Sequence, residues 1–296
     1  MALFFTVNEA WDAGDFNDLF PLLFKTSLGF LVFCILSGAV YLTNDVTDAQ
    51  RDRLHPKKRL RPIASNQLSS NMALVVSTTL SIFGTVFAFI LEPLFGWIAT
   101  GYLATMIIYT LLLKQIIVLD VLAISAGFVL RAVAGATVIQ APISVWLYIC
   151  TGLGALFIAL VKRRSELESA RGRASSQRAT LAIYTPNILD KITAITGAAV
   201  ITTYTLYAFL AQNLPPNHTM TLTIPFVVYG VFRYAYLMYV KNAGENPEDL
   251  LISDVPLILT ILSRALSLMI QMLILLCPSD PCYGQLKFEL EFWPLP

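Results

Sequence analysis

Charged side chains are scarce in this chain of 296 residues, and their scarcity fixes its setting. Asp, Glu, Lys and Arg make up 13% of the residues, against about 25% in ordinary soluble domains. Apolar residues make up 56% and gather in runs of about twenty, the length of a helix that crosses a bilayer. The composition excludes a soluble globular enzyme. It predicts an all-α, polytopic membrane protein whose partner is the bilayer and not nucleic acid.

Soluble domains, low-complexity tracts and convincing repeats are also missing, so we expect a single integral membrane domain over residues 1–296. Eight apolar runs are predicted to be transmembrane helices, at residues 22–43, 72–91, 95–113, 118–139, 143–161, 190–212, 220–240 and 255–277. The predicted fold class is therefore a transmembrane helical bundle.

Lysine and arginine are absent from every second connection between these runs. Residues 92–94, 140–142 and 213–219 contain neither, whereas each intervening loop contains at least one. Basic residues collect on the cytoplasmic side of membrane proteins. We therefore expect four loops to face the cytoplasm, namely 44–71, 114–117, 162–189 and 241–254.

A basic segment before the first apolar stretch is lacking, so no cleavable signal peptide is predicted. Cysteine is sparse as well. Cys34 and Cys150 lie in apolar runs and are expected to be packing residues. Cys277 and Cys282 flank a short outer segment, and whether they form a disulfide is left open because it depends on the compartment.

Acidic residues cluster at the end of the first apolar run. Asp45, Asp48 and Asp52 are spaced by three and four residues, so on a helix they share one face, with Asn44 at its edge. Like charges so close repel one another, and hard divalent cations such as Mg²⁺ take oxygen ligands. A solvated loop whose acids and bases neutralise one another is the alternative. The regular spacing favours a cation site.

Basic side chains on the same predicted side of the membrane suit the charge of a metal-bound diphosphate. The candidates are Arg51, Lys57, Arg59, Arg61, Lys114, Lys162 and Arg163. Two alternatives stay open. Lys114 would snorkel to the membrane interface, and the basic loop 162–189 would be a topology anchor that faces anionic lipid.

Two further features are candidate parts of a substrate site. Arg131 lies inside the run 118–139, where a charge is costly and lines a cavity or pairs with another group. A structural ion pair is the alternative. Glu248 and Asp249 belong to an acidic loop. The loop is either a polar hairpin without a role in binding, or its acids orient a sugar hydroxyl or a basic side chain.

These residues together predict a helical bundle with a polar cavity that faces the cytoplasm. Its acids would hold Mg²⁺, its cations would bind phosphate, and its apolar surroundings would admit a lipid chain. The fitting chemistry is transfer of a group away from a metal-bound diphosphate, since the metal and the cations stabilise the departing oxygens.

The segment 44–52 resembles the N-D-x-x-D-x-x-x-D motif of the UbiA-type intramembrane prenyltransferase superfamily. The continuation at 55–65, His-Pro-Lys-Lys-Arg-Leu-Arg-Pro-Ile-Ala-Ser, resembles the decaprenyl-phosphate phosphoribosyltransferase branch more narrowly. Further resemblances to that branch lie at residues 109–114, 125–131, 162–163, 166–167 and 247–249. Together they cover about residues 28–270, and their combination selects the branch.

The resemblance implies a Mg²⁺-dependent transfer of 5-phosphoribose from phosphoribosyl diphosphate to a decaprenyl-like polyprenyl phosphate, with release of diphosphate. It implies a bacterial plasma membrane, a cytoplasm-facing site and, in related actinobacteria, a product that feeds cell-wall arabinose donors. Homo-oligomers are left open. The family has nine spans, and residues 1–8 resemble only the tail of the first.

The resemblance also implies roles for residues. Asn44, Asp45, Asp48 and Asp52 would hold Mg²⁺, and Tyr109 would close the cavity. Besides the cations named above, the implied substrate-binding residues include Arg131, Glu166, Glu248 and Asp249.

A second acidic motif is lacking where isoprenyl diphosphate transferases usually carry one. That place holds Lys162-Arg163-Arg164-Ser165-Glu166 and no Asp-x-x-x-Asp. The absence argues against the first alternative, an aromatic or quinone prenyltransferase. The second alternative is a transporter or lipid carrier, but the chain shows no pair of related halves with broken helices.

Overall fold

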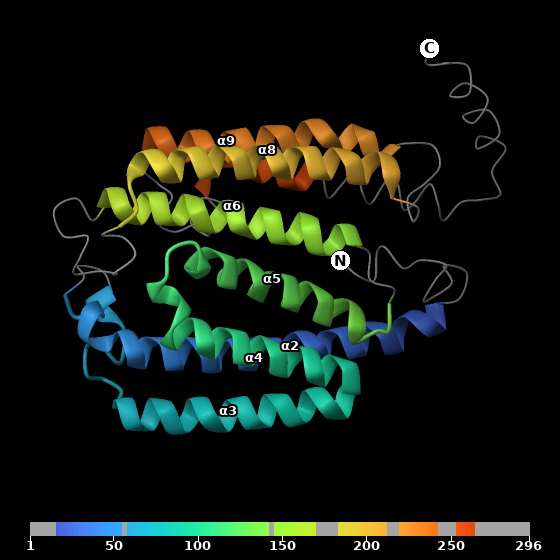
Figure 1. The fold of residues 1–296 in the computed structure, drawn as a ribbon. Helices are drawn as coiled ribbons and strands as arrows, with labels where there is room; N and C mark the ends of the chain where they lie inside the picture. Colours follow the sequence, from blue (N-terminus) through green and yellow to red (C-terminus); the bar gives the residue numbers. More distant parts are fainter. Residues whose placement is uncertain are drawn as a thin grey trace, which may run out of the picture. The chain divides into compact units, whose positions relative to one another are not determined.

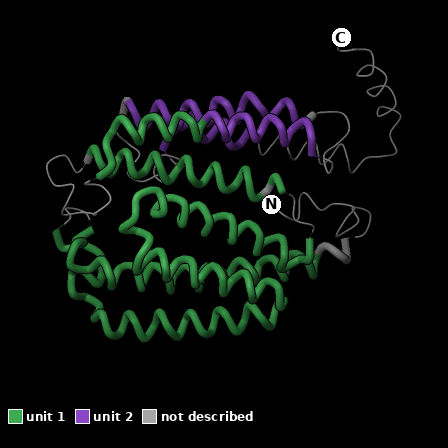
Figure 2. The backbone as a smooth tube through the Cα atoms, in the orientation of Figure 1, with its two compact units in different colours: residues 1–197 green, residues 198–296 purple. Residues whose placement is uncertain are grey.

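The computed structural model describes residues 16–54, 58–141, 145–169, 183–211, 219–241 and 253–263. All regular structure in these ranges is helical, as the composition predicts. The chain divides into two compact units, Met1–Gly197 and Ala198–Pro296, drawn in green and purple in Figure 2. The boundary falls within one helix, and each unit is described by itself.

The first unit is a bundle of long helices that alternate in direction. Its elements are α2 (Phe16–Asp52), η1 (Lys58–Leu60), α3 (Ser70–Leu91), α4 (Pro93–Leu111), η2 (Leu113–Gln115), α5 (Leu119–Thr137), α6 (Val145–Ser169) and the first half of α8 (Pro186–Leu210). The ends of α2, α4 and α6 and the beginnings of α3 and α5 lie toward the left of Figure 1. Residues far apart in the sequence therefore meet at one end of this bundle.

Helix boundaries follow local chemistry. Ser69 caps α3, because its hydroxyl accepts a hydrogen bond from the Met72 backbone N–H. Glu92 is extended and separates α3 from α4, and Pro93 occupies the first turn of α4, where its missing N–H is not needed. Two antiparallel helices are thus joined by a single residue.

The core of the first unit lies between α2, α4 and α5. It contains Leu36, Phe95, Tyr102 and Ala134, which are almost completely buried. Large apolar side chains on the outside are exposed instead, among them Ile90 at 72% and Trp97 at 68%. An apolar outer surface of this extent suits contact with lipid, because soluble proteins rarely expose such large apolar areas to water.

The second unit contains the rest of α8, η4 (Thr219–Thr223), α9 (Ile224–Lys241) and a helical segment at residues 255–263. The hydroxyls of Tyr204 and Thr223 share a buried hydrogen bond. Arg233 donates to both carboxylate oxygens of Asp254, from Nε at 3.1 Å and from Nη2 at 2.9 Å. Asp254 also accepts from the Leu257 N–H and so caps the segment that follows.

Six helices in the described ranges are long and apolar enough to cross a membrane. They are Phe20–Asp52, Ser70–Leu91, Pro93–Leu111, Leu119–Thr137, Pro186–Leu210 and Met220–Tyr239. Each overlaps one predicted run, which confirms six of the runs as helices of spanning length and apolarity. The run 143–161 is helical from Val145 onward, within α6, and the run 255–277 lies mostly outside the described residues. A total of eight spans and a shortened first span stay predictions.

The first helix is longer than its apolar run. The run ends at residue 43, but α2 continues to Asp52 and carries the whole acidic motif. Likewise α6 extends past its apolar run to Ser169. Polar ends of helices therefore project beyond the apolar part of the first unit.

Candidate functional site

Three carboxylates lie on one face at the end of α2. Because the helix reaches Asp52, the spacing of Asp45, Asp48 and Asp52 places them on successive turns of the same side. Their side chains are 23%, 14% and 8% exposed, respectively. Partly buried like charges so close together need cations nearby.

Two cations of the protein meet that need. Arg61 Nη1 donates to Asp45 Oδ1 at 2.7 Å and to Asp52 Oδ2 at 2.9 Å, so one guanidinium bridges two acids. Lys114 Nζ donates to Asp48 Oδ1 at 2.8 Å and to the Thr47 hydroxyl at 3.2 Å. Lys114 is only 5% exposed, so it is a buried partner and does not snorkel to the surface.

Arg53 holds the loop that carries Arg61. Its Nε donates to the Ala64 carbonyl at 3.2 Å, and its Nη2 donates to Asn66 Oδ1 at 2.7 Å. Asn66 has a φ of 62°, a left-handed conformation that asparagine tolerates better than most residues. The loop after α2 is thus folded back against the end of the same helix.

Asn44 provides the test of whether Mg²⁺ suits this face. Its Oδ1 atom is buried and has no hydrogen-bond partner among the described residues. An amide oxygen beside three carboxylates is a donor set that hard divalent cations accept. No group of three or more Asp, Glu, His or Cys side chains in the described ranges is already arranged around a common point. Asn44 and the three carboxylates are thus ligands of the type that Mg²⁺ takes. In this structure Arg61 bridges two of the carboxylates.

A second ionic cluster joins α5 and α6. Arg163 Nε donates to Asp120 Oδ2 at 2.8 Å, and Arg163 Nη1 donates to Glu166. Burial disfavours the charge of Arg163, but Glu166 and Asp120 outweigh it and raise the pKa above its ordinary value. Arg163, predicted to contact phosphate, is therefore a charged side chain that two carboxylates already hold.

Tyr184 completes this cluster from the segment before α8. Its hydroxyl donates to Asp120 Oδ1 at 3.0 Å and accepts from the Val118 backbone N–H at 2.8 Å. Burial raises the pKa of Tyr184 to about 12. Sequence reasoning missed Tyr184, since a lone tyrosine before a proline carries no pattern.

Other predicted cations are free to bind a ligand. The side chains of Arg51, Arg59 and Lys162 form no ion pair or hydrogen bond with the residues that the structure describes. Tyr109 is buried near the end of α4. Lys57, Glu248 and Asp249 lie outside the described residues.

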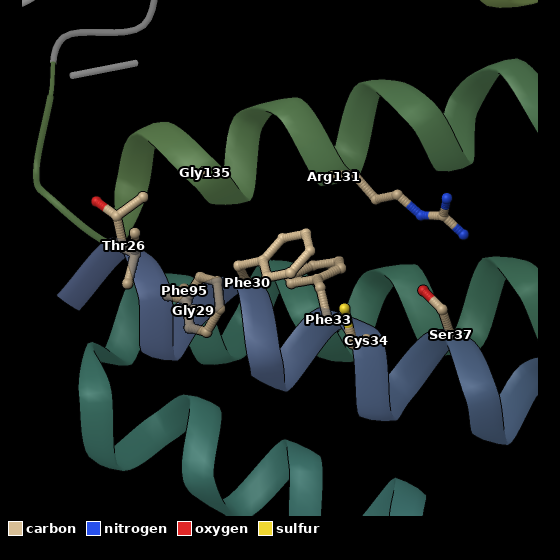
Figure 3. Close-up of a pocket in the computed structure, with 10 residues that line it drawn as sticks. Thr26, Gly29, Phe30, Phe33, Cys34, Ser37, Phe95, Arg131 and Gly135 are labelled. Atoms are coloured by element: carbon tan, nitrogen blue, oxygen red, sulfur yellow. The ribbon is translucent and has the colours of Figure 1, made fainter. Parts of the chain in front are cut away.

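Arg131 lies apart from the acids, over an apolar cavity of about 420 Å³ between α2, α4 and α5 (Figure 3). Its Nη2 donates to the Tyr102 hydroxyl, and its guanidinium lies 5.0 Å from the centre of the Tyr102 ring. No carboxylate pairs with it in the described ranges, so the ion-pair alternative finds no partner there. Its Nε is buried without a hydrogen-bond partner in the same ranges.

The cavity and the acids share one face of α2. Ser37 lines the cavity and lies 3.3 Å from the Tyr102 hydroxyl. Asn44 follows Ser37 after about two helical turns, so both point to the same side of the helix. The other lining residues are Thr26, Gly29, Phe30, Phe33, Cys34, Phe95, Gly135 and Val138.

The fold and the site together define an intramembrane helical protein with one acidic face and its own cations. The model of the UbiA prenyltransferase family matches residues 2–252, so the chain belongs to that family. This confirms the family that the motifs predicted.

Known proteins resemble this chain over most of its length. The chain is 33% identical to the decaprenyl-phosphate phosphoribosyltransferase of Mycobacterium tuberculosis over 237 residues, which are 80% of this chain and 78% of that protein. It is also 33% identical to the protein of the same name from Mycolicibacterium smegmatis, over 78% of this chain and 74% of that one. A solved UbiA homolog from Archaeoglobus fulgidus bound to GPP and Mg²⁺ shares the fold. Its TM-score is 0.65, its identity is 16%, and the match covers 84% of this chain and 85% of that one.

Proposed function

We propose that this protein transfers 5-phosphoribose from phosphoribosyl diphosphate to a polyprenyl phosphate, with release of diphosphate. The family and the relatives' names support a transferase that acts on a prenyl phosphate. One observation supports the particular donor. A single acidic face lies beside a set of cations, and the end of α6 carries Lys162 and Arg163 where a second acidic motif would serve an isoprenyl diphosphate.

Asn44, Asp45, Asp48 and Asp52 would hold Mg²⁺, which supplies positive charge to the oxygens of the donor diphosphate. The buried, unpartnered Asn44 Oδ1 supports this set. Mg²⁺ held by these residues would supply the positive charge that the carboxylates need. Arg61 and Lys114 then become available to the phosphate oxygens, since both lie within hydrogen-bond distance of the acids.

The reaction requires positioning more than proton transfer. An oxygen of the acceptor phosphate forms a bond to the anomeric carbon while the bond from that carbon to the diphosphate oxygen breaks. A phosphate monoester is already anionic near neutral pH, so no strong general base is needed. Cations fixed around the leaving diphosphate stabilise charge as it develops, which is the larger part of catalysis in such sites.

Other residues would bind the two substrates. Arg51, Lys57, Arg59, Lys162 and Arg163 are proposed to contact phosphate groups, as the free cations among them are suited to do. Tyr109 would close the site, and Glu166, Glu248 and Asp249 would orient the sugar or a basic side chain. The cavity under Arg131 would take the first isoprene units of the acceptor, because it lies on the same face of α2 as the acids.

The site is proposed to face the cytoplasm from the plasma membrane of a bacterium. Arg61, Lys114 and Arg163 gather at one end of the first unit, and the sequence has no Lys or Arg in the connections 92–94 and 140–142 at its opposite end. This contrast supports the positive-inside orientation. A single membrane domain over residues 1–296 is part of the same proposal.

Purified protein with Mg²⁺, labelled phosphoribosyl diphosphate and a polyprenyl phosphate is expected to form a labelled lipid. Asp48→Asn should abolish product, since it removes one carboxylate charge from the face, and EDTA should abolish it as well. The expected loss for Asp48→Asn is at least about a hundredfold. An undiminished yield of lipid from Asp48→Asn protein would show that the acids do not hold the metal.

A further inference from the structure

We propose that Tyr184 is a positioning residue for the diphosphate site. Its hydroxyl fixes the turn between α4 and α5 in the shape that places Lys114 against Asp48. The proposal rests on the proposed function to the extent that Lys114 acts on a metal-bound diphosphate.

The turn between α4 and α5 is strained at one residue. Val118 has φ of 68° and ψ of −43°, a positive-φ conformation outside the left-handed helical region and close to the rare classic γ-turn, which is a true outlier for a β-branched side chain. Strain of this kind persists only where the surroundings enforce it. The Val118 N–H lies at the start of α5, where no helical carbonyl is available, and it donates to the Tyr184 hydroxyl at 2.8 Å. The phenol is therefore the group that holds this residue.

Lys114 depends on the same turn for its position. It lies in η2 (Leu113–Gln115), and the backbone bonds Ile116 N–H to Leu113 O and Asp120 N–H to Ile116 O connect η2 to the first turn of α5. If Val118 relaxed to an ordinary conformation, the path of the chain from Lys114 to α5 would change. The Nζ of Lys114 would then leave its position 2.8 Å from Asp48.

Tyr184 is itself firmly placed. Its ring is 5% exposed and packs in a cluster with Val121, Leu160 and Leu189, from α5, α6 and α8. Its hydroxyl donates to Asp120, which is fully buried and also accepts from Arg163. Since burial keeps the phenol protonated far above neutral pH, the hydroxyl remains a donor under all physiological conditions. The ring and its two hydrogen bonds make a rigid support for the turn.

Tyr184→Phe removes the hydroxyl and keeps the ring. We expect the KM for the diphosphate donor to rise about tenfold, because the Val118 N–H and one Asp120 oxygen lose their partner and the turn relaxes. The KM for the lipid acceptor should stay the same. Tyr204→Phe is the matched control, since it removes a buried tyrosine hydroxyl that bonds to Thr223 in the second unit, and it should leave both KM values unchanged.

Two combinations separate positioning from a general loss of stability. In a Lys114→Ala background, Tyr184→Phe should add little to the donor KM, because the residue it positions is gone. Val118→Gly should partly restore the donor KM of Tyr184→Phe, because glycine adopts a positive φ without strain. An equal rise in both KM values, or an undiminished effect of Tyr184→Phe in the Lys114→Ala background, would overturn the proposal.

Binding of inorganic diphosphate with Mg²⁺ gives a test that does not depend on the donor. Diphosphate should raise the thermal midpoint of wild-type and Tyr204→Phe protein, and should raise that of Tyr184→Phe protein only at about tenfold higher concentration. If no phosphoribosyl lipid forms while this difference holds, the proposed function fails and the role of Tyr184 stands. Equal diphosphate affinity in all three proteins would reject the role of Tyr184.

Discussion

At the scale of single residues, the site is a set of like charges held together by the protein's own cations. The spacing of Asp45, Asp48 and Asp52 predicts their common face, and α2 confirms it. The pairing of Arg61 with two of them was not predictable, because it depends on how the loop after α2 folds back. Arg53 fixes that fold through a backbone carbonyl and an asparagine side chain, which no sequence pattern indicates.

Arg61→Gln should change metal binding and donor binding in opposite directions. Without the guanidinium, Asp45 and Asp52 repel each other, so the metal-free protein should lose about 1–3 kcal/mol of stability, a range that allows for the partial exposure of Arg61. Mg²⁺ alone should then bind more tightly, while the KM for the donor rises. Thermal denaturation with and without Mg²⁺, together with steady-state kinetics, measures both.

Arg59→Gln is the control, because Arg59 is exposed and pairs with no acid among the described residues. It should leave the stability of the metal-free protein unchanged. Weaker Mg²⁺ binding by Arg61→Gln than by wild type would contradict the competition between Arg61 and the metal.

At the scale of helices, α2, which carries the acidic motif, packs closely against α3. A Cβ atom on Gly84 would lie 2.6 Å from Leu36 Cδ2, and Leu36 is fully buried. A β-carbon on Gly101 of α4 would meet no atom within 4 Å. The two glycines therefore differ in packing, although both lie inside helices.

Gly84→Ala should destabilise the protein by about 1–3 kcal/mol, because Leu36 has no free space into which to move. Gly101→Ala should be neutral or stabilise by up to about 1 kcal/mol, since alanine favours a helix and meets nothing. The thermal unfolding midpoints of the two purified variants measure this difference in stability. Equal midpoints would show that α2 and α3 do not pack this closely.

The helices themselves were largely predictable, and their ends were less so. Apolar runs locate the six spanning helices, because crossing a bilayer demands length and low polarity. Hydropathy ends α2 at residue 43, whereas the helix continues through the polar motif to Asp52. The positive φ of Val118 was beyond sequence reasoning, since the hydrogen bond that supports it comes from Tyr184, far along the chain.

At the scale of the whole molecule, charge placement predicts orientation. Arg61, Lys114 and Arg163 lie at one end of the first unit, and the turn at Glu92 lies at the other. The end with the cations should face the cytoplasm. In that orientation, the proposed diphosphate substrate would enter from the cytoplasm.

Single cysteines in a background without Cys34, Cys150, Cys277 and Cys282 test this orientation. A thiol reagent that cannot cross membranes should label Ser65→Cys only in inside-out vesicles, because Ser65 is exposed in the loop after the motif. It should label Glu92→Cys only in right-side-out cells or vesicles. The reverse pattern would place the acids outside the cell.

Phosphoribosyl diphosphate is the proposed donor, and a donor swap tests this proposal. Purified protein in Mg²⁺ is given labelled phosphoribosyl diphosphate with a polyprenyl phosphate, and in parallel labelled isoprenyl diphosphate with hydroxybenzoate. We predict labelled lipid in the first reaction alone, since one acidic face with Arg61 and Lys114 beside it suits an anionic acceptor. Prenylated hydroxybenzoate from the second reaction, with no product from the first, would contradict it.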